Sequence, residues 1–167
     1  AMVASLTRAA EKLDKKVNNI QKNSIQPFDD DSFSNYQGRL IIPTPGKIIS
    51  KFGLLQTGDY NSFTFRKGID IKVKKGEPVK SVFKGKIMFA QWLKGYGNLI
   101  VIDHGGSYYT LYAHVEDVFK LKGEPVEGGE IIATAGDTGS IKGTYLHFEI
   151  RHHGKALNPM KWLKKGV

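Results

Sequence analysis

The feature that most constrains the fold is a series of short apolar runs that starts near residue 38 and continues almost to the C-terminus. Successive runs are roughly 8–12 residues apart and are separated by turns that contain Gly, a spacing typical of an all-β sandwich or barrel. We therefore expect an all-β domain over residues 38–167. The runs expected to form strands are 40–42, 47–49, 69–73, 79–82, 86–90, 99–102, 108–112, 130–133 and 145–150.

Two of the turns carry the same five letters. The sequence Lys-Gly-Glu-Pro-Val occurs at 75–79 and again at 122–126. This repeat indicates that a hairpin unit has been duplicated within the domain, with chance identity as the alternative for so short a match.

Residues 1–26 follow a different pattern, with apolar side chains three and four residues apart. This period predicts an amphipathic α-helix, which either docks on its own domain or is the end of a longer coiled coil. Pro27 ends the helix, and residues 27–37 are expected to form a polar linker. The apolar positions of the predicted helix are Val3, Leu6, Ala10, Leu13, Val17 and Ile20.

Composition excludes several classes of protein. The chain has no Cys, which excludes disulfides and thiolate metal sites. No apolar run approaches the roughly 20 residues of a membrane-spanning helix. The net charge is +9, but the lysines are scattered and no base-reading motif accompanies them, so we expect no nucleic-acid partner. An anionic polymer or an acidic protein surface suits this charge equally well.

Three stretches hold the candidate functional residues. Because alternate residues of a strand share a face, Arg66 with Asp70, Tyr112 with His114, and Tyr145 with His147 are each expected to point the same way. Three such strands could line a common groove. The remaining histidines, His104, His152 and His153, are expected at turns or on the surface.

These stretches belong to a wider set of motifs that resembles the LytM-type (lysostaphin-like) zinc metallopeptidases, which cut peptidoglycan crosslinks. The resemblance covers about residues 38–163 and implies antiparallel sheets that form a groove. The motifs that carry it are Gly76-Glu77-Pro78-Val79, Gly95-Tyr96-Gly97-Asn98, Tyr112-Ala113-His114, Gly136-Asp137-Thr138-Gly139, Leu146-His147-Phe148-Glu149 and Asn158-Pro159.

In active members of that family, a His-x-x-x-Asp motif and a His-x-His motif supply three zinc ligands and one catalytic histidine. The resemblance implies that Asp70 and His147 are remnant ligands and that His114 is a remnant catalytic histidine. Arg66 stands where the remaining ligand is expected and Tyr145 where the other catalytic histidine is expected.

A guanidinium has no lone pair to donate and stays protonated, and a tyrosine is a poor proton acceptor near neutral pH. We therefore expect no bound zinc, no other cofactor and no hydrolysis, and we expect the Arg66 guanidinium to pair with Asp70 instead.

One branch of this family, the murein hydrolase activators of the EnvC type, joins a coiled coil to a LytM domain that lacks zinc ligands. The chain resembles this branch, which implies a non-catalytic activator of N-acetylmuramoyl-L-alanine amidases during septal peptidoglycan splitting. It also implies an extracytoplasmic location, in the periplasm or cell envelope of a bacterium, with the signal sequence removed. Peptidoglycan and a membrane-bound division regulator are the further partners that it implies, the regulator through the coiled coil. The residues expected to contact the partner are Arg66, Asp70, Trp92, Tyr96, His114, Tyr145 and His147.

Two alternatives stay open at this point. One is an active zinc endopeptidase that uses Asp70, His147 and a third ligand outside the family pattern. The other is a passive peptidoglycan-binding module, which the basic surface favours.

Overall fold

The structure is a computed structural model, and it describes residues 32–57 and 62–165 of the 167-residue chain. The predicted helix over 1–26 and the first part of the predicted linker lie outside the described residues. Among the described residues there is no helix long and apolar enough to cross a membrane.

Within the described residues the chain is built from strands and two short 3-10 helices, η1 (Phe33–Tyr36) and η2 (Pro159–Lys161), which confirms the all-β prediction. The run 40–42 is an exception, because Leu40 makes only an isolated parallel bridge to Leu163. The strands are β1 (Lys47–Ser50), β2 (Gly53–Thr57), β3 (Ser62–Arg66), β4 (Ile69–Lys72), β5 (Pro78–Lys80), β6 (Gly85–Leu93), β7 (Gly97–Asp103), β8 (Tyr108–Val118), β9 (Pro125–Val126), β10 (Ile131–Ala135), β11 (Tyr145–His152) and β12 (Lys155–Leu157).

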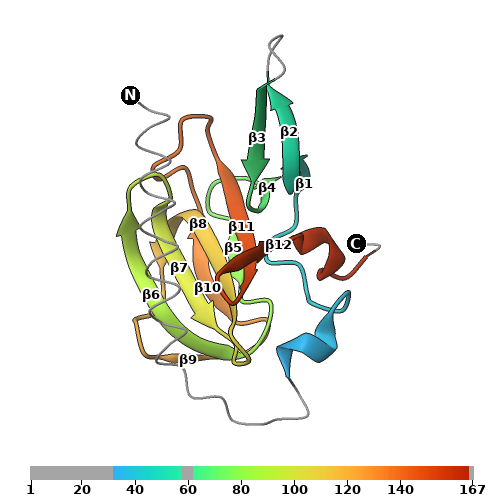
Figure 1. Ribbon diagram of the computed structural model, residues 1–167. Helices are drawn as coiled ribbons and strands as arrows, with labels where there is room; N and C mark the ends of the chain where they lie inside the picture. The colour runs from blue at the N-terminus through green and yellow to red at the C-terminus, as the bar shows by residue number, and fades with distance from the viewer. Residues whose placement is uncertain (1–31, 58–61, 166–167) are drawn as a thin grey trace.

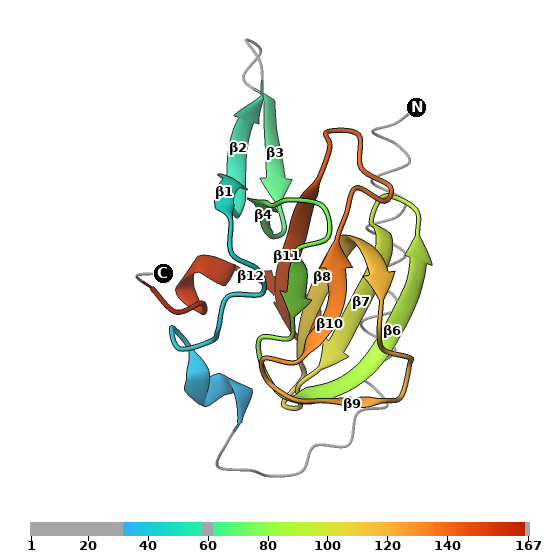
Figure 2. The same ribbon diagram turned by 180° about the vertical axis from the view of Figure 1, so that it is seen from behind.

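Ten of these strands form one antiparallel sheet, whose main path runs β1-β4-β11-β8-β7-β6-β9 (Figure 1). Strand β12 pairs with β11, and β10 pairs with both β8 and β5. Strands β5 and β10 therefore return over one face of the sheet, as the view from behind shows (Figure 2). Strands β2 and β3 form a separate two-stranded hairpin that projects from the body.

The repeated five-residue pieces adopt matching turns. Gly76 and Gly123 have φ angles of 91° and 94°, a backbone region that favours Gly. The Gly76 amide donates to Ala135 in β10, and the Gly123 amide donates to Ile87 in β6. Each repeat thus pairs with the strand that follows the other copy: β5 pairs with β10, and β9 pairs with β6. This exchange supports the predicted duplication.

Strand β11 divides the molecule into a core side and a site side. Leu146, Phe148 and Ile150 are fully buried in the main hydrophobic core. The alternate residues Tyr145 and His147, followed by Glu149 and Arg151, point to the opposite face, as the period of two requires. There they lie beside a second buried apolar cluster that includes Leu99, Val101, Tyr109, Leu111 and Ala113.

Part of the predicted linker belongs to the domain. Phe33 in η1 is 1% exposed and stacks on the Trp162 ring, with centroids 5.1 Å apart. It also stacks on His104, at 4.8 Å. The predicted polar linker over 27–37 is therefore too long, because Phe33 belongs to the folded domain and packs into its core.

The structure corrects the surface assignment of His104 and refines that of the other two. His104 is 9% exposed, with Nδ1 bonded to the Lys84 carbonyl at 2.8 Å and Nε2 to the Thr110 hydroxyl at 2.6 Å. His152 stacks on the Tyr108 ring at 3.9 Å. His153 is exposed at a turn, with φ 52°.

The buried His104 predicts a loss of stability in acid. Burial lowers its pKa from 6.5 to about 4. Below pH 6.5 the unfolded chain binds a proton that the folded state binds only near pH 4, so stability is lost as pH falls through this window, by about 3 kcal/mol at most. Urea unfolding at a series of pH values should show this slope in the wild type and in His153→Gln. His104→Gln should reduce it, and an unchanged slope would contradict the assignment.

Candidate functional site

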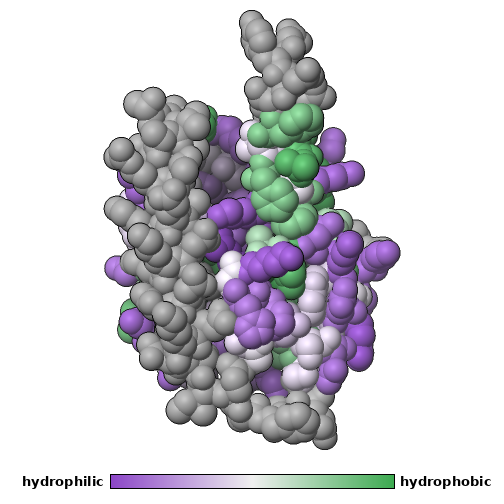
Figure 3. Space-filling model, viewed as in Figure 1, coloured by the Kyte–Doolittle hydropathy of each residue, from purple (hydrophilic) through white to green (hydrophobic). Residues whose placement is uncertain are grey.

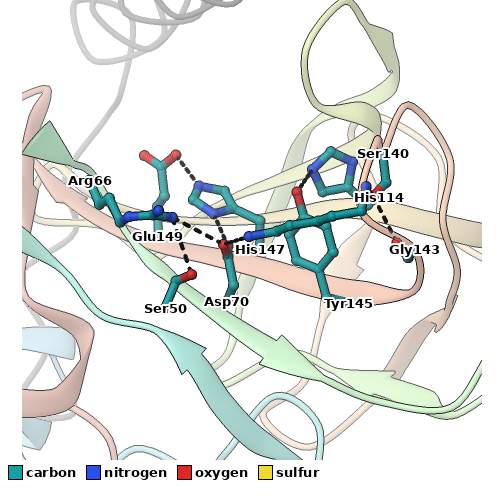
Figure 4. Close-up of polar contacts among 10 residues, drawn as sticks. Ser50, Arg66, Asp70, His114, Ser140, Gly143, Tyr145, His147 and Glu149 are labelled. Carbon is teal, nitrogen blue, oxygen red and sulfur yellow. Dashed lines mark hydrogen bonds and ion pairs between the residues drawn. The ribbon is translucent and has the colours of Figure 1, made fainter. Parts of the chain in front are cut away.

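The site is centred on a histidine that joins two neighbouring strands. His147 in β11 lies directly opposite Asp70 in β4. The His147 Nδ1 atom is 2.7 Å from Asp70 Oδ1, and its Nε2 atom is 2.8 Å from Glu149 Oε2 (Figure 4). Both ring nitrogens are therefore bonded to carboxylate oxygens. Arg151 completes the row, with Nε and Nη2 at 2.9 and 2.8 Å from Glu149 Oε1.

This arrangement fixes the protonation of the imidazole. Burial alone would lower the pKa of His147, but the hydrogen bonds to Asp70 and Glu149 outweigh it and raise the pKa to about 9. Burial likewise opposes ionisation of Asp70, whereas His147 and Lys142 lower its pKa to about 2. Near neutral pH both N–H groups of His147 consequently donate to ionised carboxylates, a charge-assisted arrangement that is stronger than neutral hydrogen bonds.

His114 reaches the same site through an irregularity in β8. Regular alternation would place it on the face of Tyr112, which points into the main core and bonds the Val82 amide. His114 instead has φ 65°, and its amide donates to the Tyr96 carbonyl. This left-handed residue turns the imidazole to the site face. The prediction that Tyr112 and His114 share a face was therefore wrong.

His114 and Tyr145 form a neutral pair. The Tyr145 hydroxyl is 3.0 Å from His114 Nε2, and His114 Nδ1 is 2.7 Å from the Thr138 carbonyl. Because that carbonyl can only accept, Nδ1 carries the proton and Nε2 accepts from the tyrosine. Burial lowers the pKa of His114, and burial together with Asp70 raises the pKa of Tyr145 to about 12. Neither group is charged near neutral pH.

Asp70 attracts two further cations, and the closer one was not anticipated. Lys142 Nζ lies 2.9 Å from Asp70 Oδ2 and 4.5 Å from the centre of the Tyr145 ring. Arg66 Nη1 lies 3.8 Å from the same oxygen and 3.1 Å from the Ser50 hydroxyl. The predicted Arg66–Asp70 ion pair is thus present but long. The prediction that Arg66 and Asp70 share a face of one strand was wrong. Arg66 ends β3 and Asp70 lies in β4, and these two strands belong to different sheets.

The remaining predicted residues lie at the edges of this cluster. The Tyr96 ring centre is 6.1 Å from that of His147, and the side chain is buried. Trp92 is 57% exposed on β6. Glu149 and Lys142 were missed. The alternation of β11 could have indicated Glu149, whereas Lys142 lies in the β10–β11 loop, where no periodic pattern signals its direction.

The side chains do not fit the zinc centre that the fold family implies. Within the part of the chain that the structure describes, no group of three or more His, Cys, Asp and Glu is placed to hold a metal. Zinc ligation requires a nitrogen lone pair, whereas both ring nitrogens of His147 contact carboxylate oxygens. Four cationic side chains share two carboxylates: Arg66, Lys142, Arg151 and the protonated His147 against Asp70 and Glu149. The excess positive charge opposes a dication here.

Comparison with known proteins agrees with the sheet architecture, which is that of a peptidase-like domain. The model of peptidase family M23 matches residues 64–159, and the chain belongs to this family. The murein hydrolase activator NlpD of Escherichia coli is 41% identical over 122 residues, which are 72% of this chain and 30% of that protein. The murein hydrolase activator EnvC of the same organism is 32% identical over 127 residues, 76% of this chain and 29% of that protein.

A zinc-containing peptidase from Vibrio cholerae has the same fold, with a TM-score of 0.67 and 30% identity over 74% of this chain and 40% of its own. The chain is therefore similar both to a protein named as a zinc-containing peptidase and to proteins named as murein hydrolase activators. The chain spans under a third of the length of the activators it matches.

The position of His114 depends on a close contact between the first residue of β7 and the loop that contains Thr138. Gly97 has φ 65°, and a Cβ atom there would lie 2.0 Å from the carbonyl oxygen of Thr138, the group that His114 Nδ1 contacts. Gly97→Ala should therefore lower the free energy of unfolding by about 2–4 kcal/mol through overlap and left-handed strain. Gly128→Ala is the matched control, because its Cβ would have no neighbour nearer than 3.5 Å. Denaturant unfolding that shows equal stability for the two variants would contradict this contact.

Proposed function

We propose that this chain is a non-catalytic activator of cell-wall N-acetylmuramoyl-L-alanine amidases. One observation carries the proposal: every polar atom that a metal would need on His147 and Asp70 already contacts another side chain. A hydrolytic zinc usually needs three protein ligands and an open position for water. The residues of this site form a closed network of hydrogen bonds and ion pairs instead.

The relatives support a role of this kind. Two proteins that the chain resembles are named murein hydrolase activators. The stretch that matches the family model, residues 64–159, contains all of the site residues from Arg66 to Arg151. Murein lies outside the cytoplasm, so an extracytoplasmic location is part of the proposal. The amidase as partner is our inference from the family resemblance, and it gives the proposal a defined enzyme assay.

Activation would follow from differential binding. The exposed edge of the site is basic and partly apolar: Arg66 and Lys142 have side chains 33% and 40% exposed, and Ile141 and Trp92 are 75% and 57% exposed. We infer that this edge binds an acidic, amphipathic segment that blocks the amidase active site. A partner that binds only the released segment shifts the amidase toward its open state.

The buried members of the cluster serve this edge indirectly. Tyr96, His114 and Tyr145 are each less than 10% exposed. Tyr145 holds His114 by its hydroxyl and Lys142 by its ring face. We therefore assign Arg66, Lys142 and Trp92 to direct contact with the partner, and Tyr145 and His114 to positioning.

The proposal predicts a loss of activation without loss of folding. Arg66→Glu reverses a charge at the exposed edge and should lower stimulation of the amidase at least tenfold. Tyr145→Ala should act similarly, because Lys142 loses its support. The measurement is release of dye-labelled fragments from purified sacculi by the amidase with and without each variant.

Lys86→Glu makes the same charge change at an exposed position of β6 and serves as the control. It should stimulate as the wild type does. Full stimulation by Arg66→Glu and Tyr145→Ala would place the contact elsewhere. Binding of the wild type to sacculi without any stimulation of an amidase would favour a passive peptidoglycan-binding module.

A second prediction concerns metal. The wild-type chain should bind zinc weakly, with no stoichiometric binding at about 10 μM in calorimetry, because Arg66, which has no lone pair to donate, stands at the position of the third ligand. The double substitution Arg66→His and Tyr145→His should strengthen binding. Stoichiometric zinc in the wild type, together with cleavage of peptidoglycan crosslinks, would instead identify an endopeptidase.

A further inference from the structure

The β2–β3 hairpin carries an apolar face that nothing in the described structure covers. Phe63 and Phe65 alternate on β3, and Leu54 on β2 lies directly opposite Phe65. These three side chains consequently share one face of the ribbon. They are 63%, 51% and 73% exposed. Figure 3 shows the apolar side chains gathered over β2 and β3 on the face seen in Figure 1.

This exposure is large for a free surface. With roughly 200 Å² for each large apolar side chain, the three leave on the order of 400 Å² of apolar area open. That area is comparable with the largest patch on a typical monomer, and such patches are often functional. A two-stranded ribbon without a covered face is also marginally stable by itself. Both arguments favour a face that becomes covered when a partner binds.

The apolar face adjoins the site described above along the chain, at the base of the hairpin. Arg66, which contacts Asp70, directly follows Phe65 and pairs with Gly53 across the hairpin. At the base of the ribbon the Phe52 ring meets the Phe65 ring edge-on, with centroids 5.2 Å apart. Because neighbouring residues of a strand point to opposite faces, the Arg66 side chain leaves the ribbon on the face opposite Phe65. A partner therefore has to reach around the edge of this two-stranded ribbon to contact both.

The charges around the ribbon indicate what kind of molecule this is. Residues 47–67 contain four basic residues, Lys47, Lys51, Arg66 and Lys67, and one acidic residue, Asp59. A hollow of about 540 Å³ at the base, which Phe52 and Phe65 help to line, also contains Lys155 and Lys161. An acidic partner with an apolar stripe matches this surface, whereas a second copy of a chain with net charge +9 is repelled.

We propose that the apolar face of Leu54, Phe63 and Phe65 is a second contact for the amidase, one that takes an amphipathic segment with acidic flanks. This inference rests on the proposed function. The size of the apolar face supports a partner shared with the site. Its exposed area of about 400 Å² is near half of what each partner buries in a standard protein interface. The hairpin therefore forms a stable interface only together with the neighbouring edge of the site.

Affinity measurements test this directly. Leu54→Ser and Phe63→Ser should each weaken binding of the purified amidase roughly tenfold, as truncation of an apolar anchor does. Leu121→Ser is the matched control, because Leu121 is also 73% exposed but lies in the β8–β9 loop. It should bind as the wild type does. Equal affinity for all three variants would overturn the proposal.

A second measurement locates the contact even if a hairpin variant alters the ribbon. The chain has no cysteine, so Leu54→Cys and Leu121→Cys each accept a single environment-sensitive fluorophore. Addition of the amidase should shift the emission to the blue and reduce iodide quenching at position 54, and should leave position 121 unchanged. A silent probe at 54 with bound amidase overturns the inference. The inference is also overturned if the emission shifts to the blue as the concentration of this chain rises without amidase and sedimentation shows a dimer.

The outcomes separate the two proposals. If the wild-type chain neither binds nor stimulates an amidase, the proposed function fails and the hairpin contact fails with it. If the wild type stimulates the amidase while both hairpin variants do so with unchanged affinity, only the hairpin contact fails.

Discussion

A protonated imidazole held between two carboxylates is the interaction on which the site depends. His147 connects Asp70 on β4 with Glu149 on its own strand, and Arg151 and Lys142 close the two ends of the row. If the imidazole were neutral, one of the two carboxylates would lose its charge-assisted hydrogen bond from the ring and would keep only the cation at its own end of the row, Lys142 for Asp70 or Arg151 for Glu149. The sheet pairing of β4 with β11 and the position of Lys142 are therefore coupled to one proton.

Sequence periodicity predicted the site wherever the strands are regular. Tyr145 and His147 share a face because β11 is a regular strand, and Asp70 meets His147 through the register between β4 and β11. The period fails where the backbone departs from it. His114 sits at a left-handed residue, and a break at 67–68 separates Arg66 from Asp70. A pattern of alternating side chains contains no information about such irregularities.

Other features were missed because their signals differ from those of a core strand. Lys142 approaches Asp70 from a loop, and loop directions are set by tertiary contacts rather than by local spacing. Strand β2 was not predicted, because its adjacent apolar residues Leu54 and Leu55 do not alternate with polar ones. Both side chains are exposed in the structure, so the strand lacks the buried face that produces such a pattern. Phe33 looked like part of a polar linker, yet a single aromatic side chain was enough to anchor that segment. Burial of one ring can outweigh the composition of its neighbours.

The exchange between the two repeats has a consequence for how the domain folds. Strand β5 finds its partner in β10, more than fifty residues further along the chain, and β9 pairs back with β6. Each half of the domain therefore holds a strand that only the other half can complete. Such non-local pairing gives a high contact order, which slows folding and makes it cooperative. Although the sequence reads as two copies of a hairpin unit, neither copy is a separable module, and a chain cut between them should contain two incomplete sheets.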